Sequence, residues 1–303
     1  MSLKVSGLTK IYGEQRAVDD ITFEAPKGKI TGFLGPNGAG KSTTMKIATG
    51  YIAPTTGTVY LDDLDVLTHE LDVKRLTGYL PEHNPLYLDM YVREFFRFIG
   101  RAYGVKDLKN RVEEMIELVG LTNERDKKIK ALSKGYRQRV GLGQSMIHDP
   151  SILILDEPTT GLDPNQIVDI RNLILEIAKE KTVILSTHIM QEVEAICDKV
   201  VIIDKGKIVA DDSIAVLKAD SDKQPSFIMT FEQPVTPELF SAFGAERVDD
   251  QTVKASSGQE NLRAELLKVI SENDLPLVRI SKSNEQSLED VFRKLTGKKQ
   301  EPC

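Results

Sequence analysis

Hydrophobic residues alternate with polar ones at the start of the chain, a two-residue period that is typical of strands. This alternation predicts three strands between Leu3 and Gly35, separated by turn signals at Gly13 and at Lys27 and Gly28. The third strand leads directly into the segment GPNGAGKST, after which TTMKIATG is predicted as a helix and TGTVYLDDLDV as strand and turn. A strand, a glycine loop and a helix in this order form a phosphate-binding unit.

The hydrophobic period becomes helical between about Asp89 and Gly120, where VREFFRFIGRAYG and DLKNRVEEMIELVG each place apolar residues on one helix face. We expect an all-helical insertion here, within a helical subdomain of about residues 89–150. The later segments SILILD and TVILST are apolar without alternation, which indicates a mainly parallel sheet covered on both faces. The helix NQIVDIRNLILEIAKE separates them, and VVIIDKGKIVADD predicts a hairpin around Lys205 and Gly206.

A polar, proline-containing stretch, ADSDKQPS, predicts a domain boundary near residue 220. Beyond it the pattern predicts strand FIMTFE, helix TPELFSAF, strands around ERVDD and TVKAS, helix NLRAELLKVISEND, strand LVRISK and helix SLEDVFRKL. This order resembles a ferredoxin-like βαββαβ unit. Residues 220–303 are therefore expected to form a small C-terminal α+β accessory domain.

The segment GPNGAGKST matches the pattern GxxxxGK[ST] from Gly35 to Ser42. In such a loop the backbone N–H groups close around phosphate oxygens, Lys41 reaches the β and γ phosphates, and the Ser42 hydroxyl can ligate Mg²⁺. The alternative, a glycine-rich structural turn, is disfavoured because a strand and a helix flank the loop. The predicted nucleotide-binding residues are Gly35, Pro36, Asn37, Gly38, Ala39, Gly40, Lys41, Ser42 and Thr43.

These patterns together define the expected fold class. Residues 1–219 are predicted to form an α/β domain of the P-loop NTPase type, with a mixed, mainly parallel sheet and the helical insertion. Residues 220–303 add the ferredoxin-like domain.

Composition narrows the function classes only a little. A length of 303 residues allows about two domains, and 40% hydrophobic with 28% charged residues argues against wholesale disorder. The net charge of −6 gives no basic field, so nucleic acid is not an expected partner. The cysteines Cys197 and Cys303 form no metal-binding pattern, and no apolar run approaches the roughly 18 residues that predict a membrane span. We expect a cytoplasmic chain.

The hydrophobic segment SILILDEP ends in two carboxylates, and strand ends beside a glycine loop are where open α/β sheets bind ligands. Asp156 can hold Mg²⁺ and Glu157 can orient water. Alone, however, an Asp-Glu pair after a strand is more often a solvated turn. A lone histidine is likewise usually a structural or surface residue, which is our interpretation of His69, His83 and His148.

Three further segments stand around ILILDEP in a fixed order: LSKGYRQR at 132–139, TTGLDP at 159–164 and STHIMQEVE at 186–194. The set resembles the ATP-binding subunits of ABC transporters. The resemblance implies that ATP and Mg²⁺ are bound and that two motor domains stack head to tail. It also implies that Ser133 and Gly135, in the signature segment of one domain, contact the γ-phosphate held by the other domain. Asp163 matches the D-loop of the family, and His188 matches its switch histidine.

The same resemblance assigns adenine stacking to Tyr12 and a metal contact to Glu82, which lies in a proline-flanked loop from Tyr79 to Pro85. Without it, Tyr12 could equally be a packing residue and Glu82 a solvated one. Two departures stand out, because the family usually shows LSGGQ instead of LSKGY and a glutamine at the position of Glu82. A carboxylate can take the same metal contact. The expected catalytic residues are Glu157, His188 and Lys41, and the expected metal ligands are Ser42, Glu82 and Asp156.

Within this family the tail SLEDVF looks like the C-terminal extension of ATPases paired with polymer, drug or lipid exporters. The segments GYLPEHNPLYLDMYVREF and ALSKGYRQRVGL look like the gliding-motility-associated ATP-binding subunit of Bacteroidetes bacteria. These likenesses imply a peripheral location on the inner face of the cell membrane, a membrane-spanning permease subunit as partner, and a second ATP-binding subunit, with a homodimer expected.

Two alternative classes are weaker: a soluble ABC protein that acts on ribosomes or DNA, and a non-hydrolysing nucleotide sensor. A soluble ABC protein acting on ribosomes commonly carries two phosphate loops, whereas GPNGAGKST occurs once. One acting on DNA would need a long coiled coil between Thr43 and Leu132, where the interval is too short, and the acidic balance disfavours DNA. A non-hydrolysing nucleotide sensor would lack Glu157.

Overall fold

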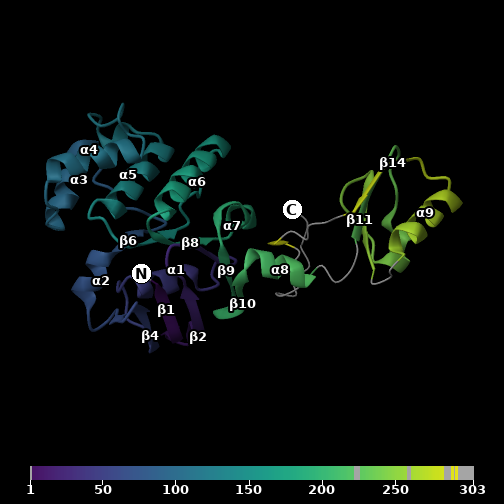
Figure 1. Ribbon diagram of the computed structural model, residues 1–303, viewed down its shortest axis with the longest axis horizontal. Helices are drawn as coiled ribbons and strands as arrows, with labels where there is room; N and C mark the ends of the chain where they lie inside the picture. The colour runs from purple at the N-terminus through teal and green to yellow at the C-terminus, as the bar shows by residue number, and fades with distance from the viewer. Residues whose placement is uncertain (1, 222–225, 258–260, 283–287, 290, 293–303) are drawn as a thin grey trace. The chain divides into compact units, whose positions relative to one another are not determined.

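The computed structural model describes residues 2–221, 226–257, 261–282, 288–289 and 291–292. The chain divides into two compact units, Met1–Ser213 and Ile214–Cys303 (Figure 1). The helix α8 (Ile214–Ser221) belongs to the second unit, so this division lies somewhat before the boundary predicted near residue 220. No helix in these described ranges is long and apolar enough to cross a membrane.

Two sheets form the first unit. An antiparallel sheet has the order β2-β1-β4-β5, with strands β1 (Leu3–Tyr12), β2 (Gln15–Ala25), β4 (Thr56–Leu61) and β5 (Leu64–Asp65). A six-stranded sheet has the order β10-β9-β3-β8-β7-β6, with strands β3 (Ile30–Leu34), β6 (Thr77–Leu80), β7 (Ile152–Asp156), β8 (Thr182–Thr187), β9 (Lys199–Asp204) and β10 (Lys207–Ser213). Only β10 runs antiparallel to its neighbour, which confirms the mainly parallel sheet.

Apolar side chains cover both faces of the six-stranded sheet. Along β7, Ile152 and Ile154 join the core shared with α1 and the antiparallel sheet, whereas Leu153 and Leu155 join the core on the opposite face. All these residues are buried, which explains why the strand sequence shows no alternation.

The helices of the first unit lie on the two faces of this sheet (Figure 1). They are α1 (Lys41–Ala48), α2 (Glu70–Leu76), α3 (Val92–Ala102), α4 (Leu108–Leu118), α5 (Lys134–Met146), α6 (Pro164–Ala178) and α7 (Met190–Ile196), with a 3₁₀ turn at Ile129–Ala131. Helices α3, α4 and α5 pack on one another as the expected helical insertion. The Phe96 ring lies so close to Gly143 of α5 that a larger residue there would displace it.

The second unit contains a four-stranded antiparallel sheet of order β12-β13-β11-β14. After α8, its described elements are β11 (Ser226–Phe231), the 3₁₀ helix η2 (Pro237–Phe243), β12 (Glu246–Arg247), β13 (Thr252–Ser256), α9 (Leu262–Glu272) and β14 (Leu277–Lys282). This strand order is that of a ferredoxin-like βαββαβ unit, as the sequence predicts. The last predicted helix, SLEDVFRKL, lies mostly outside the described residues.

Two elements differ from the sequence expectation. Tyr79 and Leu80 belong to β6 rather than to a loop. The strand pattern in the sequence is weak here because it contains Gly78, where the backbone of α5 approaches closely at Ser145. The segment η2 is a kinked 3₁₀ helix, in which the buried residues Phe240 and Phe243 lie three positions apart. A 3₁₀ helix places such residues on one side.

Candidate active site at the phosphate loop

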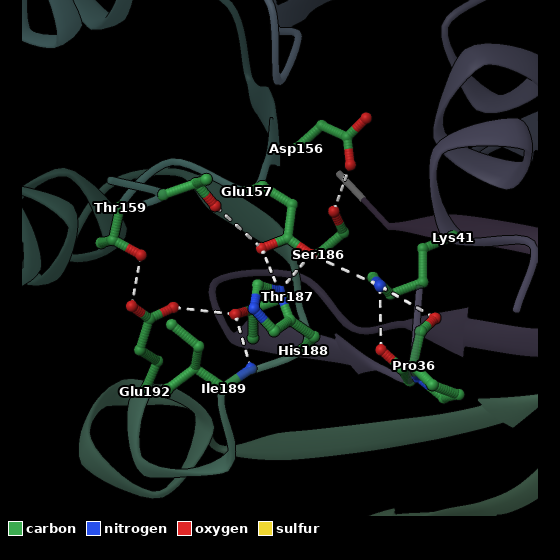
Figure 2. Close-up of polar contacts among 12 residues, drawn as sticks. Pro36, Lys41, Asp156, Glu157, Thr159, Ser186, Thr187, His188, Ile189 and Glu192 are labelled. Atoms are coloured by element: carbon green, nitrogen blue, oxygen red, sulfur yellow. Dashed lines mark hydrogen bonds and ion pairs between the residues drawn. The ribbon is translucent and has the colours of Figure 1, made fainter. Parts of the chain in front are cut away.

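The glycine-rich segment joins β3 to α1 as predicted, and α1 begins at Lys41. The Nζ atom of Lys41 donates to the carbonyl oxygens of Gly35, at 2.8 Å, and Pro36, at 3.3 Å. The ammonium group therefore folds back over the loop, and its side chain is only 6% exposed (Figure 2). By contrast, Asn37 and Gly38 at the tip of the loop are exposed and available to a ligand.

Backbone from two other strands holds the loop in place. A Cβ at Gly35 would overlap the carbonyl oxygen of Ile203 in β9, and a Cβ at Gly40 would overlap that of Ala17 in β2. Gly40 also has a φ of 109°, which L side chains rarely adopt. Both glycines are thus required by packing as well as by the approach of a phosphate.

Asp156 ends β7 directly beside the first residues of α1. Its Oδ1 atom accepts hydrogen bonds from the hydroxyl groups of Ser42, at 3.2 Å, and Ser186. Burial raises the pKa of Asp156 above its ordinary value; the two hydroxyl groups oppose this rise, and the carboxylates of Glu82 and Glu157 add to it. A divalent cation here would offset both the burial and the like charges.

Glu157 holds the centre of the site, with its carboxylate only 6% exposed. Its Oε1 atom lies 3.4 Å from Nζ of Lys41, and its Oε2 atom lies 2.9 Å from Nδ1 of His188 (Figure 2). The Thr160 hydroxyl donates to Oε2 at 3.2 Å. The backbone of Glu157 has a left-handed φ of 51°, and its N–H donates to the Ser186 carbonyl at 3.0 Å. This conformation is uncommon in residues other than glycine, and the hydrogen bond to Ser186 holds Glu157 in it.

The expected Mg²⁺ ligands are oxygen donors that share one cavity. Ser42, Asp156 and Glu82 all line a cavity of about 600 Å³, with Glu82 exposed. In the described parts of the chain no three His, Cys, Asp or Glu residues gather into a metal cluster. Mg²⁺ needs no such cluster, because it binds through one or two carboxylates together with substrate phosphates and waters. The residues present therefore fit this ion.

The structure brings the other predicted contacts together as a second group, which we call the signature group: Ser133, Gly135 and Asp163. Ser133 caps α5 and accepts a hydrogen bond from the N–H of Tyr136 at 3.4 Å, and Asp163 caps α6 by accepting from Gln166 at 3.0 Å. Gly135 packs directly against the Gln166 side chain. Among the described residues, no hydrogen bond or ion pair joins the signature group to Lys41, Asp156 or Glu157.

Lys134, which departs from the family pattern, packs against a glycine of the loop that follows β7. The Lys134 ammonium lies against Gly161, where a Cβ would overlap it and where φ is 71°. The long side chain therefore rests on the D-loop of the same chain. Tyr136 is 39% exposed at the same helix start.

Tyr12 ends β1, opposite Gln15 in the β1–β2 hairpin. Its ring is 48% exposed, and Nζ of Lys10 lies 5.1 Å from the ring centre. The paired strand β2 contacts the phosphate loop at Gly40. An exposed ring on this hairpin is a surface on which a base can stack.

The other histidines have local partners. His69 is exposed, and its Nδ1 atom lies 2.9 Å from the Thr68 hydroxyl. His148 stacks on Tyr103 with ring centres 3.9 Å apart, and burial lowers its pKa. His83 is exposed on the rim of the cavity that Glu82 lines.

Sequence reasoning missed several polar partners of the site. Ser186 and Thr160 bond directly to the two carboxylates, and both stand inside the segments STHIMQEVE and TTGLDP. Glu192, four positions after His188, was also missed.

A phosphate loop between strand and helix, with a buried carboxylate pair at the end of a strand in the same sheet, defines a nucleoside triphosphatase of the P-loop class. The ABC transporter family matches residues 18–160. The bacitracin transport ATP-binding protein BcrA of Bacillus licheniformis is 35% identical over 302 residues, which cover 97% of this chain and 97% of that protein. The chain therefore belongs to the ATP-binding subunits of ABC transporters, which hydrolyse ATP to power transport.

Two further comparisons agree. The Nod factor export ATP-binding protein I of Ralstonia nicotianae is 32% identical over 318 residues, covering 98% of this chain and 94% of that protein. A solved structure of the ATP-binding subunit of an ABC transporter is 29% identical, with a TM-score of 0.66, and covers 73% of this chain and 93% of that one. These findings confirm the predicted family, fold and ATPase activity.

Proposed function

We propose that this chain is the ATP-hydrolysing subunit of an export system, and that it powers a separate membrane-spanning permease. The support comes from two relatives that match it along nearly their full length, one named for bacitracin transport and the other for Nod factor export. The proposal includes a peripheral place on the inner face of the membrane and no nucleic-acid partner.

One observation carries the proposed chemistry: the buried Glu157 carboxylate lies between Lys41 and His188. Phosphoryl transfer to water asks the protein mainly for positioning and charge stabilisation. Glu157 would orient the attacking water and accept its proton, while Lys41 would bind the β and γ phosphates. His188 would contact the γ-phosphate.

The metal has a defined place in this proposal. Ser42 and Asp156 would hold Mg²⁺, together with Glu82, which lines the same cavity. When bound, the ion neutralises charge on the phosphate oxygens.

The separate position of the signature group supports a dimer. Ser133, Gly135 and Asp163 are preformed at two helix starts but make no hydrogen bond or ion pair with Lys41, Asp156 or Glu157 among the described residues. A second copy stacked head to tail would bring its own signature group to the phosphate loop. We propose a homodimer because one chain carries both halves of such a site.

We also propose a more specific function for this export system, a link to gliding motility. It rests on the likeness of GYLPEHNPLYLDMYVREF and ALSKGYRQRVGL to those subunits. The named relatives support export more directly. Recovery of the tagged chain from its native cells in mild detergent, with the permease that accompanies it, would identify the export system.

The substitution Glu157→Gln tests the proposed chemistry. We expect ATP binding to persist while turnover falls by about 10²–10⁴-fold, because the amide cannot accept a proton. Size-exclusion chromatography with ATP should then show a trapped dimer. Glu176→Gln, at an exposed glutamate on α6, is the matched control. Unchanged turnover in Glu157→Gln would exclude this role for the residue.

A further inference from the structure

Glu192 is a buried carboxylate with no place in the chemistry described so far. It lies in the first turn of α7 and is 1% exposed. Its Oε1 atom accepts a hydrogen bond from the Thr159 hydroxyl, and its Oε2 atom accepts one from the Thr187 hydroxyl at 2.9 Å (Figure 2). The two oxygens of one carboxylate thus hold two different segments of the chain.

Each of these segments carries a residue of the proposed active site. Thr159 follows Glu157 by two positions, and the next residue, Thr160, donates directly to the Glu157 carboxylate. Thr187 precedes His188 directly. The Thr187 hydroxyl also accepts a hydrogen bond from the N–H of Ile189 at 3.0 Å, which fixes the turn that presents His188.

The energetics favour a role beyond packing. Burying a charged carboxylate is costly unless hydrogen bonds compensate for lost water, and an apolar side chain would fill such a space at lower cost. Within the described chain, Glu192 has no cation at ion-pair distance, so the two threonine hydroxyl groups compensate its burial. An apolar residue could not hold two hydroxyl groups at a fixed separation.

We propose that Glu192 is a positioning residue for ATP hydrolysis, whose carboxylate fixes the Glu157 segment relative to the His188 segment. This inference rests on the roles proposed above for Glu157 and His188. Glu192 touches neither nucleotide nor water in this scheme. It acts by keeping the Glu157 carboxylate and the His188 imidazole in register, at the distance of 2.9 Å.

The test uses the full chain and isosteric substitutions. Each of three substitutions weakens a hydrogen bond between Glu192 and a threonine hydroxyl: Thr159→Val, Thr187→Val and Glu192→Gln. Two further substitutions, Thr159→Ser and Thr187→Ser, keep the hydroxyl donor. We expect kcat for ATP hydrolysis to fall roughly 10- to 100-fold in the first three variants, as for a displacement of about 1 Å at a reacting group. KM for ATP should change by less than about threefold, and the serine variants should stay near wild type.

Thr9→Val is the matched control for stability. The Thr9 hydroxyl is also buried and accepts a hydrogen bond from the N–H of Asp20 at 3.0 Å, and Thr9 does not line the cavity of the proposed metal site. This variant should lose thermal stability comparably while keeping kcat.

Three results would overturn the inference. They are Thr159→Val and Thr187→Val variants with kcat within twofold of wild type, serine variants as impaired as these valine variants, or a kcat loss that follows the melting temperature in Thr9→Val as well. If Glu192→Gln fails to fold, the threonine variants decide. Glu157→Gln separates the two proposals: full turnover there refutes the proposed chemistry, whereas lost turnover there with normal valine variants refutes only the role of Glu192.

Discussion

His188 and Glu157 lie 31 positions apart in the sequence, yet Nδ1 of the first is 2.9 Å from Oε2 of the second. The histidine proposed to contact the γ-phosphate is thus held by the carboxylate proposed to orient water. Lys41 contacts the same carboxylate from the other side, at 3.4 Å. Under the roles proposed above, the Glu157 carboxylate would link the contact with the γ-phosphate to the orientation of the attacking water.

This contact predicts that the pair acts as a unit. His188→Ala should lower kcat by about 10–10²-fold, because Glu157 loses a partner that orients it. Combining His188→Ala with Glu157→Gln should cost little more than Glu157→Gln alone. Steady-state ATPase assays of the three variants measure this, and losses that multiply in the double variant would contradict the coupling.

Asp156 predicts a dependence of stability on pH. Its pKa is raised in the folded chain by burial, so between the ordinary value of 3.8 and the raised value the folded state binds more protons than the unfolded state. Stability of the ligand-free protein should therefore fall as the pH rises through that window. Asp156→Asn should remove this loss.

At pH 7, Asp156→Asn should melt about 2–4 °C higher than wild type, the shift that roughly 1 kcal/mol produces in a domain of this size. It should nevertheless lose Mg²⁺-dependent hydrolysis. Scanning calorimetry without nucleotide measures the first effect, and Asp72→Asn, at an exposed carboxylate, is the control. A lower melting temperature for Asp156→Asn would show that its two hydroxyl contacts outweigh the burial of charge.

Glu82 gives a prediction for metal use. A glutamine carbonyl can replace one carboxylate oxygen, so Glu82→Gln should keep hydrolysis while weakening its Mg²⁺ dependence. Glu82→Ala removes the oxygen donor and should require several-fold more Mg²⁺ for half-maximal activity. ATPase activity across a magnesium titration distinguishes the two. An alanine variant that titrates like wild type would remove Glu82 from the metal site.

His148 should make the fold sensitive to acid. Burial lowers the pKa of His148, so the unfolded state takes up a proton before the folded state as the pH falls below the ordinary value of 6.5. The stability from the neutral, stacked ring is present above pH 6.5 and is lost on acidification. His148→Phe keeps the stacking on Tyr103 without the titration. Its melting temperature should fall less between pH 7 and pH 5 than that of wild type, and equal slopes would contradict this.

Local patterns predicted the phosphate loop and the carboxylate pair well, because each depends on a strand and the residues directly after it. Gly35 to Ser42 and Asp156 with Glu157 lie where such reasoning places them. The order of strands and helices along the chain in the second unit was likewise predicted. These features need no knowledge of which strands are neighbours.

The remaining parts of the site depend on strand order, which sequence alone did not provide. Because β8 lies between β3 and β7, Ser186 reaches Asp156, and Thr187 and His188 face the segment after Glu157. The contact of Glu192 with Thr159 crosses 33 positions for the same reason. A short strand such as β6 escapes prediction because close packing there requires Gly78.

The close approach of the Ile203 backbone to Gly35 and of the Ala17 backbone to Gly40 has a consequence for genetics. A loss-of-function screen for transport should recover substitutions at both glycines, and the encoded proteins should accumulate poorly in cells because the loop cannot seat against β2 and β9. Substitutions at exposed Asn37 should instead give normally abundant, inactive protein. Protein abundance would then sort alleles of this loop into those that affect assembly of the domain and those that affect the nucleotide.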